Sequence, residues 1–322
     1  MRMNTQTEKK GNAVVRFVLN HNTYFVFALL FIICSILSDR FLSLLNLRNI
    51  LLQQCAPILI SVGMLMVILT GGIDLSVGSV TAIGSSLTAV LITNMGVPWP
   101  LAMIVSLIAG CLLGAFTGML VAYLNFQGFV ASLAMMTIAR GIAYTITNAT
   151  PINMADGTLN SLTFKANGYP IIWITIIVIA VFAIIGHFTA YGRLVVATGS
   201  NSEAVNLSGI RVKRYVLSVY VVSGFLSALA GIFLAARSGV GNSTVADGQE
   251  LDAIASCVIG GASLAGGKGS VMRTVVGALI LALIGNIMNL MSIPAYPQNI
   301  IKGLIIIIAV LMQVLTDKRK AN

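Results

Sequence analysis

The sequence predicts an all-α protein that crosses the membrane about ten times, with a parallel internal repeat and membrane segments broken by glycine. Of the 322 residues, 57% are hydrophobic and only 9% are charged, and the mean hydropathy is +0.97. So few charges cannot cover the surface of a water-soluble domain of this length. The apolar segments have the length of membrane helices rather than of barrel strands. A glycine-rich motif that occurs twice, each time before an apolar segment, indicates the repeat.

Ten apolar segments follow one another along the chain, if tilted or broken helices are allowed. The eighth is too short to cross alone, so it begins earlier, runs re-entrant or continues through Gly260 and Gly261. The ten segments are Tyr24–Leu37, Asn49–Leu69, Ser76–Thr93, Pro100–Leu124, Phe129–Thr147, Pro170–Phe188, Tyr215–Ala236, Leu251–Ile259, Val271–Met291 and Gln298–Leu315.

The first segment, Tyr24–Leu37, follows several basic residues, as the core of a signal peptide does. It lacks a small-residue cleavage site, so we expect an uncleaved first helix. No polar stretch is long enough to fold separately, which predicts a single membrane domain at 24–315. Residues 1–23 and 316–322 are then an N-terminal segment and a C-terminal tail.

Basic residues are concentrated in alternate connections, which predicts the orientation of the chain. The connections expected outside hold four: Arg40, Arg48, Lys165 and Arg237. The connections expected in the cytoplasm hold more: Arg2, Lys9, Lys10, Arg16, Arg193, Arg211, Lys213, Arg214, Lys268, Arg273, Lys318, Arg319 and Lys320. Both termini are therefore placed in the cytoplasm. The basic residues behind the net charge of +10 flank apolar segments, so they indicate how the chain is oriented in the lipid bilayer. They do not indicate a nucleic-acid-binding surface.

The two glycine motifs both fall on the predicted cytoplasmic side, each before a segment that runs outward. Broken backbone at membrane depth persists only where protein or a water-filled path surrounds it, so such motifs are typical of transporters. The repeat units run from Asn49 to Thr147 and from Tyr215 to Leu315. The motif residues are Gly71, Gly72, Asp74, Ser76 and Gly78 in the first copy, and Gly260, Gly261, Gly266, Gly267 and Lys268 in the second.

No catalytic constellation is visible in the sequence, and neither a metal-ligand spacing nor a Cys–His pairing occurs. The stretch around Lys268 superficially resembles a phosphate-binding loop. However, Ala262 stands where the first glycine would be, and Gly269 replaces the Ser or Thr that would hold magnesium. We therefore expect no catalytic site, no metal and no cofactor in this chain, and any energy from ATP has to come from another subunit.

Several residues in apolar surroundings are unusual. Asp74 and Arg140 are ionisable, and such groups usually face a partner or a wet cavity. They can pair with each other or line a path, and a structural role is favoured. Four uncharged polar residues can contact sugar hydroxyls or bind backbone at helix breaks: Gln53, Gln54, Asn286 and Asn289.

Two further patterns concern packing. Gly110, Gly114 and Gly118 recur on one helix face and predict close approach of another helix of the same chain. The connection Ala190–Arg214 contains a short predicted helix, Asn201–Ile210. Asn201 or Ser202 can cap its start, Glu203 suits its first turn, and Gly209 suits a left-handed end. Its small side chains at Ala204 and Ser208 suit docking into a groove of another protein.

Three motifs in this order resemble the permease subunits of bacterial monosaccharide ABC importers. They are Gly72–Ser79, Asn201–Ile210 and the stretch from Glu250 to Gly269, and the resemblance covers nearly the whole chain after about Tyr24. It implies a permease in the bacterial inner (cytoplasmic) membrane that carries ribose or a related sugar. It also implies that the helix at Asn201–Ile210 couples the chain to an ATPase.

The resemblance further implies the partners. These are a second copy of the permease, a cytoplasmic ATPase with two fused nucleotide-binding halves that binds ATP and magnesium, and a periplasmic sugar-binding protein. Three other functions stay open: an ion-coupled secondary carrier, a scaffold or membrane enzyme, and a permease for branched-chain amino acids or a furanosyl signal molecule. Transport that collapses with an ionophore at constant ATP would identify the carrier.

Overall fold

The computed structural model describes residues 22–155, 159, 168–294, 296–305, 307, 308 and 311. Predictions for 1–21 and for the tail at 316–322 lie outside the described residues. The helices are α2 (Asn22–Leu37), α3 (Leu44–Leu69), α4 (Val77–Thr93), α5 (Trp99–Leu124), α6 (Gly128–Thr147), α8 (Tyr169–Phe188), α9 (Ala190–Ser200), α10 (Ser202–Leu207), α11 (Val212–Ser238), α12 (Gln249–Ile259) and α13 (Val271–Leu290). A further helix, here called the C-terminal helix, begins at 296 and is described continuously to 305.

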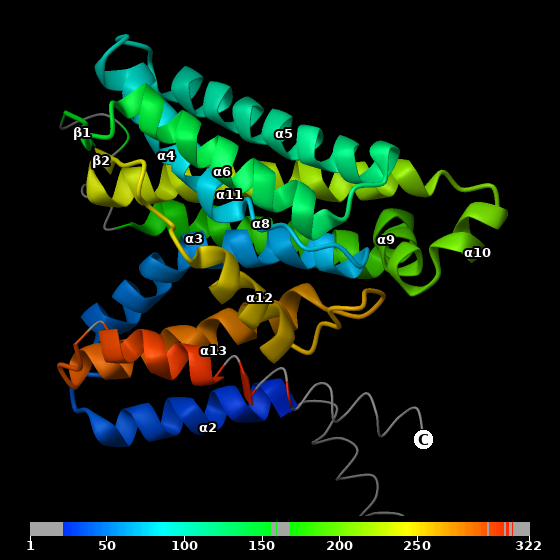
Figure 1. Ribbon diagram of the computed structural model, residues 1–322. Coiled ribbons are helices and arrows are strands. Elements are labelled where there is room, and N and C mark those ends of the chain that lie inside the picture. Colours follow the sequence, from blue (N-terminus) through cyan, green and yellow to red (C-terminus); the bar gives the residue numbers. More distant parts are fainter. Residues whose placement is uncertain are drawn as a thin grey trace, which may run out of the picture.

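The fold class is confirmed: the described chain is a bundle of roughly parallel helices (Figure 1). Six of the described helices, α3, α5, α6, α8, α11 and α13, are long and apolar enough to cross a membrane. The apolar helices α2 and α4 are shorter, with 16 and 17 residues. The predicted count of about ten crossings is therefore not confirmed.

The eighth predicted segment is a half-helix. α12 has 11 residues and starts only two residues before the predicted position. It does not continue through Gly260 and Gly261, because Gly261 has φ of +84° and ends the helical path. Residues 242–248 before it are not helical and run along α4, where the Asn242 N–H donates to Ser85 Oγ at 3.2 Å.

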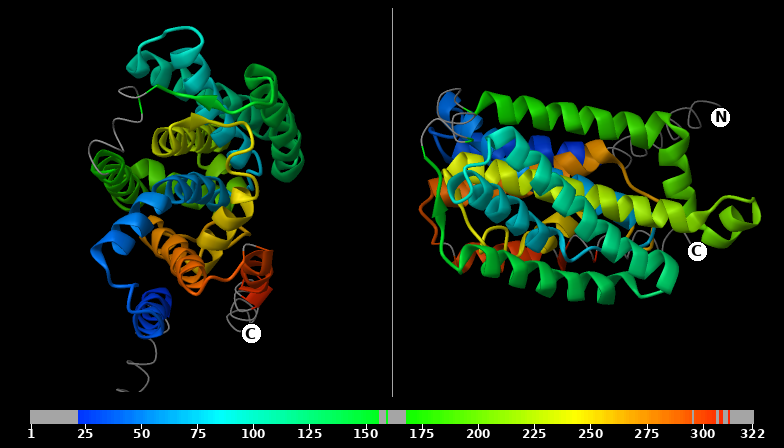
Figure 2. Two further views of the ribbon diagram at one scale, coloured as in Figure 1. Left: turned by 90° about the vertical axis from the view of Figure 1, so that its left-hand side faces the viewer. Right: turned by 90° about the horizontal axis from the view of Figure 1, so that it is seen from above.

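α3 and α11 form the centre of the bundle, and both are largely buried. Figure 2 shows them end-on, surrounded by the other helices. α5 packs along α11 through the three predicted glycines: a Cβ at Gly110 would lie 2.5 Å from the carbonyl oxygen of Gly224, and one at Gly118 would lie 2.9 Å from Tyr220 Cβ. The prediction of packing within the chain is confirmed, since glycine lets the two backbones touch.

Both glycine turns lie at the end of the bundle that carries α9 and α10 (Figure 1). α4 and α13 leave these turns in the same direction, as a parallel repeat requires. The flanking helices are not equivalent, however. α12 packs closely on α13, whereas α3 and α4 barely touch and α4 packs on α11 instead. The repeat is thus clearest in the turns themselves.

The connection Ala190–Arg214 contains one more helix than the sequence indicated. α9 begins after Thr189, whose Oγ1 accepts a hydrogen bond of 3.2 Å from the Gly192 N–H. This Thr cap is a recognised helix-start signal. At the opposite end of the bundle, β1 (Ile152–Asn153) pairs antiparallel with β2 (Val240–Gly241) and joins the two halves of the chain.

Candidate functional site

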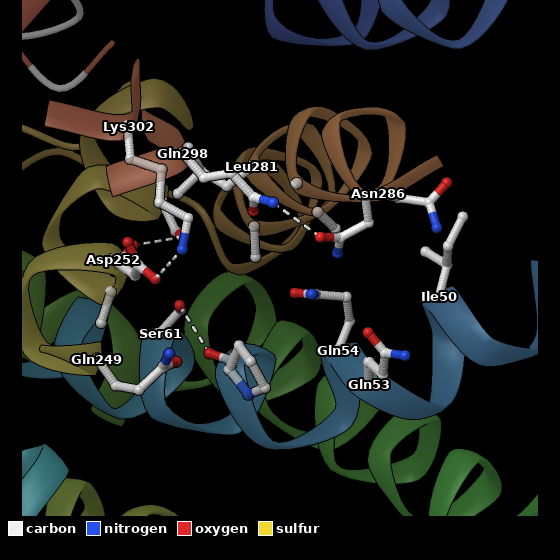
Figure 3. Close-up of a pocket in the computed structure, with 17 residues that line it drawn as sticks. Ile50, Gln53, Gln54, Ser61, Gln249, Asp252, Leu281, Asn286, Gln298 and Lys302 are labelled. Carbon is white, nitrogen blue, oxygen red and sulfur yellow. Dashed lines mark hydrogen bonds and ion pairs between the residues drawn. The ribbon is translucent and has the colours of Figure 1, made fainter. Parts of the chain in front are cut away.

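A polar cavity of about 180 Å³ lies between the first half of α3, α12, the second half of α13 and the C-terminal helix (Figure 3). Because α13 starts at the α10 end, the cavity is displaced toward the other end of the bundle. Ten of its seventeen lining residues are polar, and six of these are carboxamides. The polar lining residues are Gln53, Gln54, Ser61, Gln249, Asp252, Ser256, Asn286, Asn289, Gln298 and Lys302.

The structure brings all four predicted polar residues to this one cavity. Asn286 exchanges two hydrogen bonds with Asn46, at 2.8 and 3.1 Å, and Asn289 Oδ1 accepts from Gln298 Nε2 at 2.8 Å. These asparagines therefore bind side chains and not the backbone at a helix break. Among the described residues, the side-chain amides of Gln53 and Gln54 have no hydrogen-bond partner and are available to a ligand.

An ion pair at one end of the cavity was not anticipated. Lys302 Nζ of the C-terminal helix lies 3.1 Å from Asp252 Oδ2 of α12, and both side chains are partly accessible. Figure 3 shows this pair at one end and Gln54 and Asn286 toward the other. The available signal was a single lysine in an otherwise apolar segment, which usually marks a functional position.

Pro57 lies inside α3 and also lines the cavity. Proline has no N–H, so it cannot donate to the carbonyl of Gln53 one helical turn earlier. That carbonyl is a further acceptor beside the cavity. The cavity is thus bordered by one helix with a missing backbone bond and by the half-helix α12. Irregular backbone of this kind is tolerated at membrane depth where it lines a polar space.

The first glycine turn is fixed by Asp74, which is 1% exposed. Its Oδ1 accepts from the Ser76 N–H at 3.0 Å and from Ser76 Oγ at 2.6 Å, and its Oδ2 accepts from Ser223 Oγ of α11 at 2.7 Å. Gly71 has φ of +82°, which favours glycine. Asp74 therefore has the structural role that the sequence favoured, because it ties the turn to the central helix.

Gly72 and Gly78, the other two glycines of the first motif, are required by close neighbours. A Cβ at Gly72 would lie 2.8 Å from the hydroxyl of Tyr220. A Cβ at Gly78 would lie 2.5 Å from the carbonyl oxygen of Ala246 and 2.6 Å from Glu250 Oε2. Side chains at either position would force these neighbours to move.

Arg140 does not pair with Asp74, so this option raised by the sequence is wrong. Its Nη1 donates to the carbonyl oxygens of Ser243 and Val245 at 2.8 and 2.9 Å, and its Nη2 lies 4.0 Å from Asp247. All three partners belong to the segment before α12. Arg140 thus holds the non-helical segment before α12 against α6, a contact between segments 103 or more residues apart that the sequence order does not reveal.

The second glycine turn connects α12 to α13. Gly260 is packed so closely that a Cβ would lie 2.7 Å from the carbonyl oxygen of Arg273, and Gly266 and Gly267 have φ of +90° and +71°. Lys268 is exposed, and its carbonyl accepts from the Ser263 N–H at 2.9 Å. Lys268 thus faces outward at the end of the bundle that carries α10.

The two glycine turns meet each other and α9 at a junction formed by Leu69, Gly71, Gly199, Gly266 and Gly267, here called the glycine junction. The Gly267 N–H donates to the carbonyl oxygen of Leu69 at 3.0 Å. A Cβ at Gly199 would overlap that same oxygen and lie 2.7 Å from Gly267 N. No side chain separates the three backbones, so a displacement of the end of α9 acts directly on both turns.

The predicted docking helix is present as α10. Asn201 is its N-cap, with Oδ1 accepting from the Ala204 N–H at 2.9 Å, and Gly209 has φ of +80°. Glu203, Ala204 and Ser208 are exposed, and the Ser208 hydroxyl donates to the Ala204 carbonyl at 2.9 Å.

α10 also carries an apolar side chain on its outer face. Leu207 is 82% exposed, while Val205 is buried and holds the helix to the body. Beside α10 lies a cleft of about 740 Å³ whose walls include Gly71, Gly72 and Tyr220. An exposed leucine beside an open cleft at a polar end of the bundle is suited to a protein partner.

The described residues contain no group of three or more His, Cys, Asp and Glu side chains that could hold a metal ion. The arrangement offers hydrogen-bonding groups within a helical bundle and a projecting contact helix. It therefore supports binding and movement of a polar solute more readily than covalent chemistry.

A multi-pass helical bundle with glycine-broken segments, a polar cavity between its helices and a projecting helix defines a membrane permease. The family model described as the permease component of the branched-chain amino acid transport system matches residues 46–310. The chain belongs to this family. No solved structure was found to match it.

Curated relatives span almost the full length of the chain. The ribose import permease protein RbsC of Haemophilus influenzae is 41% identical over 95% of this chain and 96% of that protein. The protein of the same name from Bacillus subtilis is 40% identical over 91% of each chain. The xylose transport system permease protein XylH of Escherichia coli is 34% identical over 87% of each chain.

Proposed function

We propose that the chain is the permease subunit of an ATP-driven importer for a monosaccharide, with ribose or a related pentose as the substrate. The observation that carries the proposal is the cavity rich in carboxamides between α3, α12 and α13. Carboxamides donate and accept hydrogen bonds at once, which suits the hydroxyls of a neutral sugar. The names of the relatives support the same solute class.

In the proposed importer the permease acts together with other subunits. The chain itself binds no cofactor, and ATP and magnesium are bound by a separate cytoplasmic ATPase with two fused nucleotide-binding halves. A second copy of the permease completes the path, and a periplasmic binding protein delivers the sugar. Residues 24–315 form the single domain that spans the bacterial inner membrane, with 1–23 and 316–322 in the cytoplasm. Gln53, Gln54, Asn286 and Asn289 line part of the path.

Purified permease, ATPase and sugar-loaded binding protein, reconstituted together in liposomes, are expected to import ribose with ATP. Hydrolysis should be absent from the permease alone and should be stimulated by the loaded binding protein, because the chain has no phosphate-binding loop. Labelled ribose uptake and phosphate release are the measurements. Robust hydrolysis by the permease free of other chains would contradict the proposal. Uptake that stops with an ionophore at constant ATP would indicate an ion-coupled carrier.

The orientation can be tested with single cysteines. Two exposed positions at opposite ends of the bundle are suitable: Glu203 in α10, and Met95, which is 67% exposed. Glu203→Cys is expected to react only with a reagent applied from the cytoplasm, and Met95→Cys only from the periplasm, because positive charge is retained inside. Labelling in right-side-out and inverted vesicles measures this. Periplasmic labelling of the Glu203 site would show the reverse orientation.

Branched-chain amino acids are the second candidate substrate, because the family description names them. A branched apolar side chain would be expected to select a pocket with an apolar lining. The same liposomes supplied with leucine and with ribose, each with the matching binding protein, distinguish the two substrates.

A further inference from the structure

The geometry points to a monosaccharide subsite within a single chain, in which the Asp252–Lys302 ion pair supplies the ligand-binding groups that select an uncharged polyhydroxyl solute. This inference rests on the proposed function and adds to it the residues and the ligand chemistry. Neither residue was indicated as path-lining by the sequence.

The cavity has a suitable size for a small ligand and is bordered by several helices. A cavity of about 180 Å³ has room for several waters, and therefore for one small polyol once they leave. Its walls come from α3 and, far from it in sequence, from the consecutive helices α12, α13 and the C-terminal helix. A ligand here touches all four, so its binding can favour one arrangement of these helices over another.

The charges of the residues that line the cavity favour a neutral ligand. Among the described residues that line the cavity, Asp252 and Lys302 are the only ionisable ones, and they carry opposite charges. The cavity as a whole is therefore neutral, and a ligand with net charge would leave one member of the pair without compensation. Six carboxamides complete the lining and have no charge preference. This combination selects a neutral solute with many hydroxyl groups.

A zwitterion such as an amino acid fits the polar lining of the cavity less well than a sugar does. An amino acid could match the ion pair with its own two charges, but it would have to separate a contact of 3.1 Å. Its apolar side chain would then offer no hydrogen bond to the amides of Gln53 and Gln54, which have no partner among the described residues. A sugar instead accepts from the ammonium group and donates to the carboxylate while both stay in place, and its other hydroxyls reach the amides.

The Asp252–Lys302 ion pair also has a role in the absence of ligand. It joins the half-helix α12 to the C-terminal helix, and the Ser256 hydroxyl donates to the Asp252 carbonyl within α12. The pair is thus part of the helix packing as well as of the cavity. A test has to separate these two roles.

The experiment uses the complete reconstituted importer with ribose-loaded binding protein. The variants are Asp252→Asn, Lys302→Met, the charge exchange Asp252→Lys with Lys302→Asp, and the conservative Lys302→Arg. Copurification with the ATPase reports assembly, and initial uptake at saturating loaded binding protein reports transport. Asp247→Asn is the matched control, since Asp247 is 82% exposed and lies near Arg140 outside this cavity.

We expect each single neutralisation to lower uptake about tenfold or more, because the sugar loses one charged hydrogen-bonding group and the remaining, partly accessible charge loses its partner. The charge exchange restores the ion pair between the two helices, so the ATPase copurifies with this variant. Uptake stays about tenfold low, because the donor and the acceptor have changed places relative to the sugar. Lys302→Arg assembles normally and lowers uptake, since the larger guanidinium fills the cavity. Asp247→Asn transports like the wild type.

Three results would overturn the inference while the wild type imports ribose. The first is uptake within about twofold of wild type by both single variants. The second is uptake restored to the wild-type level by the charge exchange. If the charge-exchanged importer does not assemble, the third is normal uptake by Lys302→Arg. Import of leucine and not of ribose by the wild type would also overturn it. A wild type that imports neither contradicts the proposed function itself, so the two failures are distinguishable.

Discussion

Replacing Gly199 with alanine is expected to lower ATP-driven uptake about tenfold or more, because overpacking two backbones costs on the order of 1–3 kcal/mol or more. The added Cβ would overlap the carbonyl oxygen of Leu69 and press on the N–H of Gly267. Those two groups are hydrogen-bonded to each other at 3.0 Å and connect the two glycine turns. The methyl group therefore pushes apart the two turns from which α4 and α13 begin.

The matched control is Gly141→Ala. Gly141 also lies within a helix, α6, but a Cβ there meets no atom within 4 Å. Alanine is favoured over glycine in a helix by about 1 kcal/mol, so this variant should be as stable as the wild type or slightly more stable. Uptake, ATPase copurification and thermal stability in detergent are measured for both variants. Wild-type uptake by Gly199→Ala would show that the glycine junction tolerates separation and does not transmit movement.

Replacing Ala204 with tryptophan is expected to abolish the stimulation of the ATPase by sugar-loaded binding protein. Ala204 is exposed on α10, so the change does not disturb the packing of its own chain. If a partner contacts this face as closely as a core, overpacking costs about 1–3 kcal/mol, which corresponds to about 5–150-fold weaker coupling. The ATPase can move the permease only through contacts that differ between its two states.

The variant should insert in the membrane at the wild-type level, because Ala204 lies outside the membrane-spanning helices. Leu207→Ala is a second variant on the same helix, since Leu207 is 82% exposed and its removal weakens an apolar contact without adding bulk. Copurification of the ATPase and stimulated hydrolysis are the readouts. Normal uptake by Ala204→Trp at wild-type expression would show that α10 is not the coupling element.

The structure gives α10 a direct connection to the rest of the chain. Ser200 is the last residue of α9, and α10 begins two residues later at Ser202. Gly199 in the same helix is part of the glycine junction. A force on α10 therefore reaches both glycine turns over a few residues. This short connection is the physical reason why Gly199→Ala and Ala204→Trp are both expected to have large effects.

The sequence by itself determined the membrane fold and most helix ends. Apolar segments of bilayer length have to be helical, since their backbone groups find no water. Local signals then placed the caps: Asn201 and Gly209 act within their own helix, so the predicted ends of α10 are present. Resemblance in three motifs indicated the family, and the family match over residues 46–310 together with the identity to ribose permeases confirmed it.

Only the tertiary structure decided which distant groups meet. Lys302 pairs with Asp252 across 50 residues, Arg140 binds carbonyls 103 and 105 residues away, and Asp74 binds Ser223. The two glycine motifs appeared as repeated turns in the sequence, and the structure showed that they touch each other and Gly199. The reason is physical: helix periodicity and caps depend on neighbours within a few residues, whereas ion pairs and backbone contacts between helices depend on how the whole bundle packs.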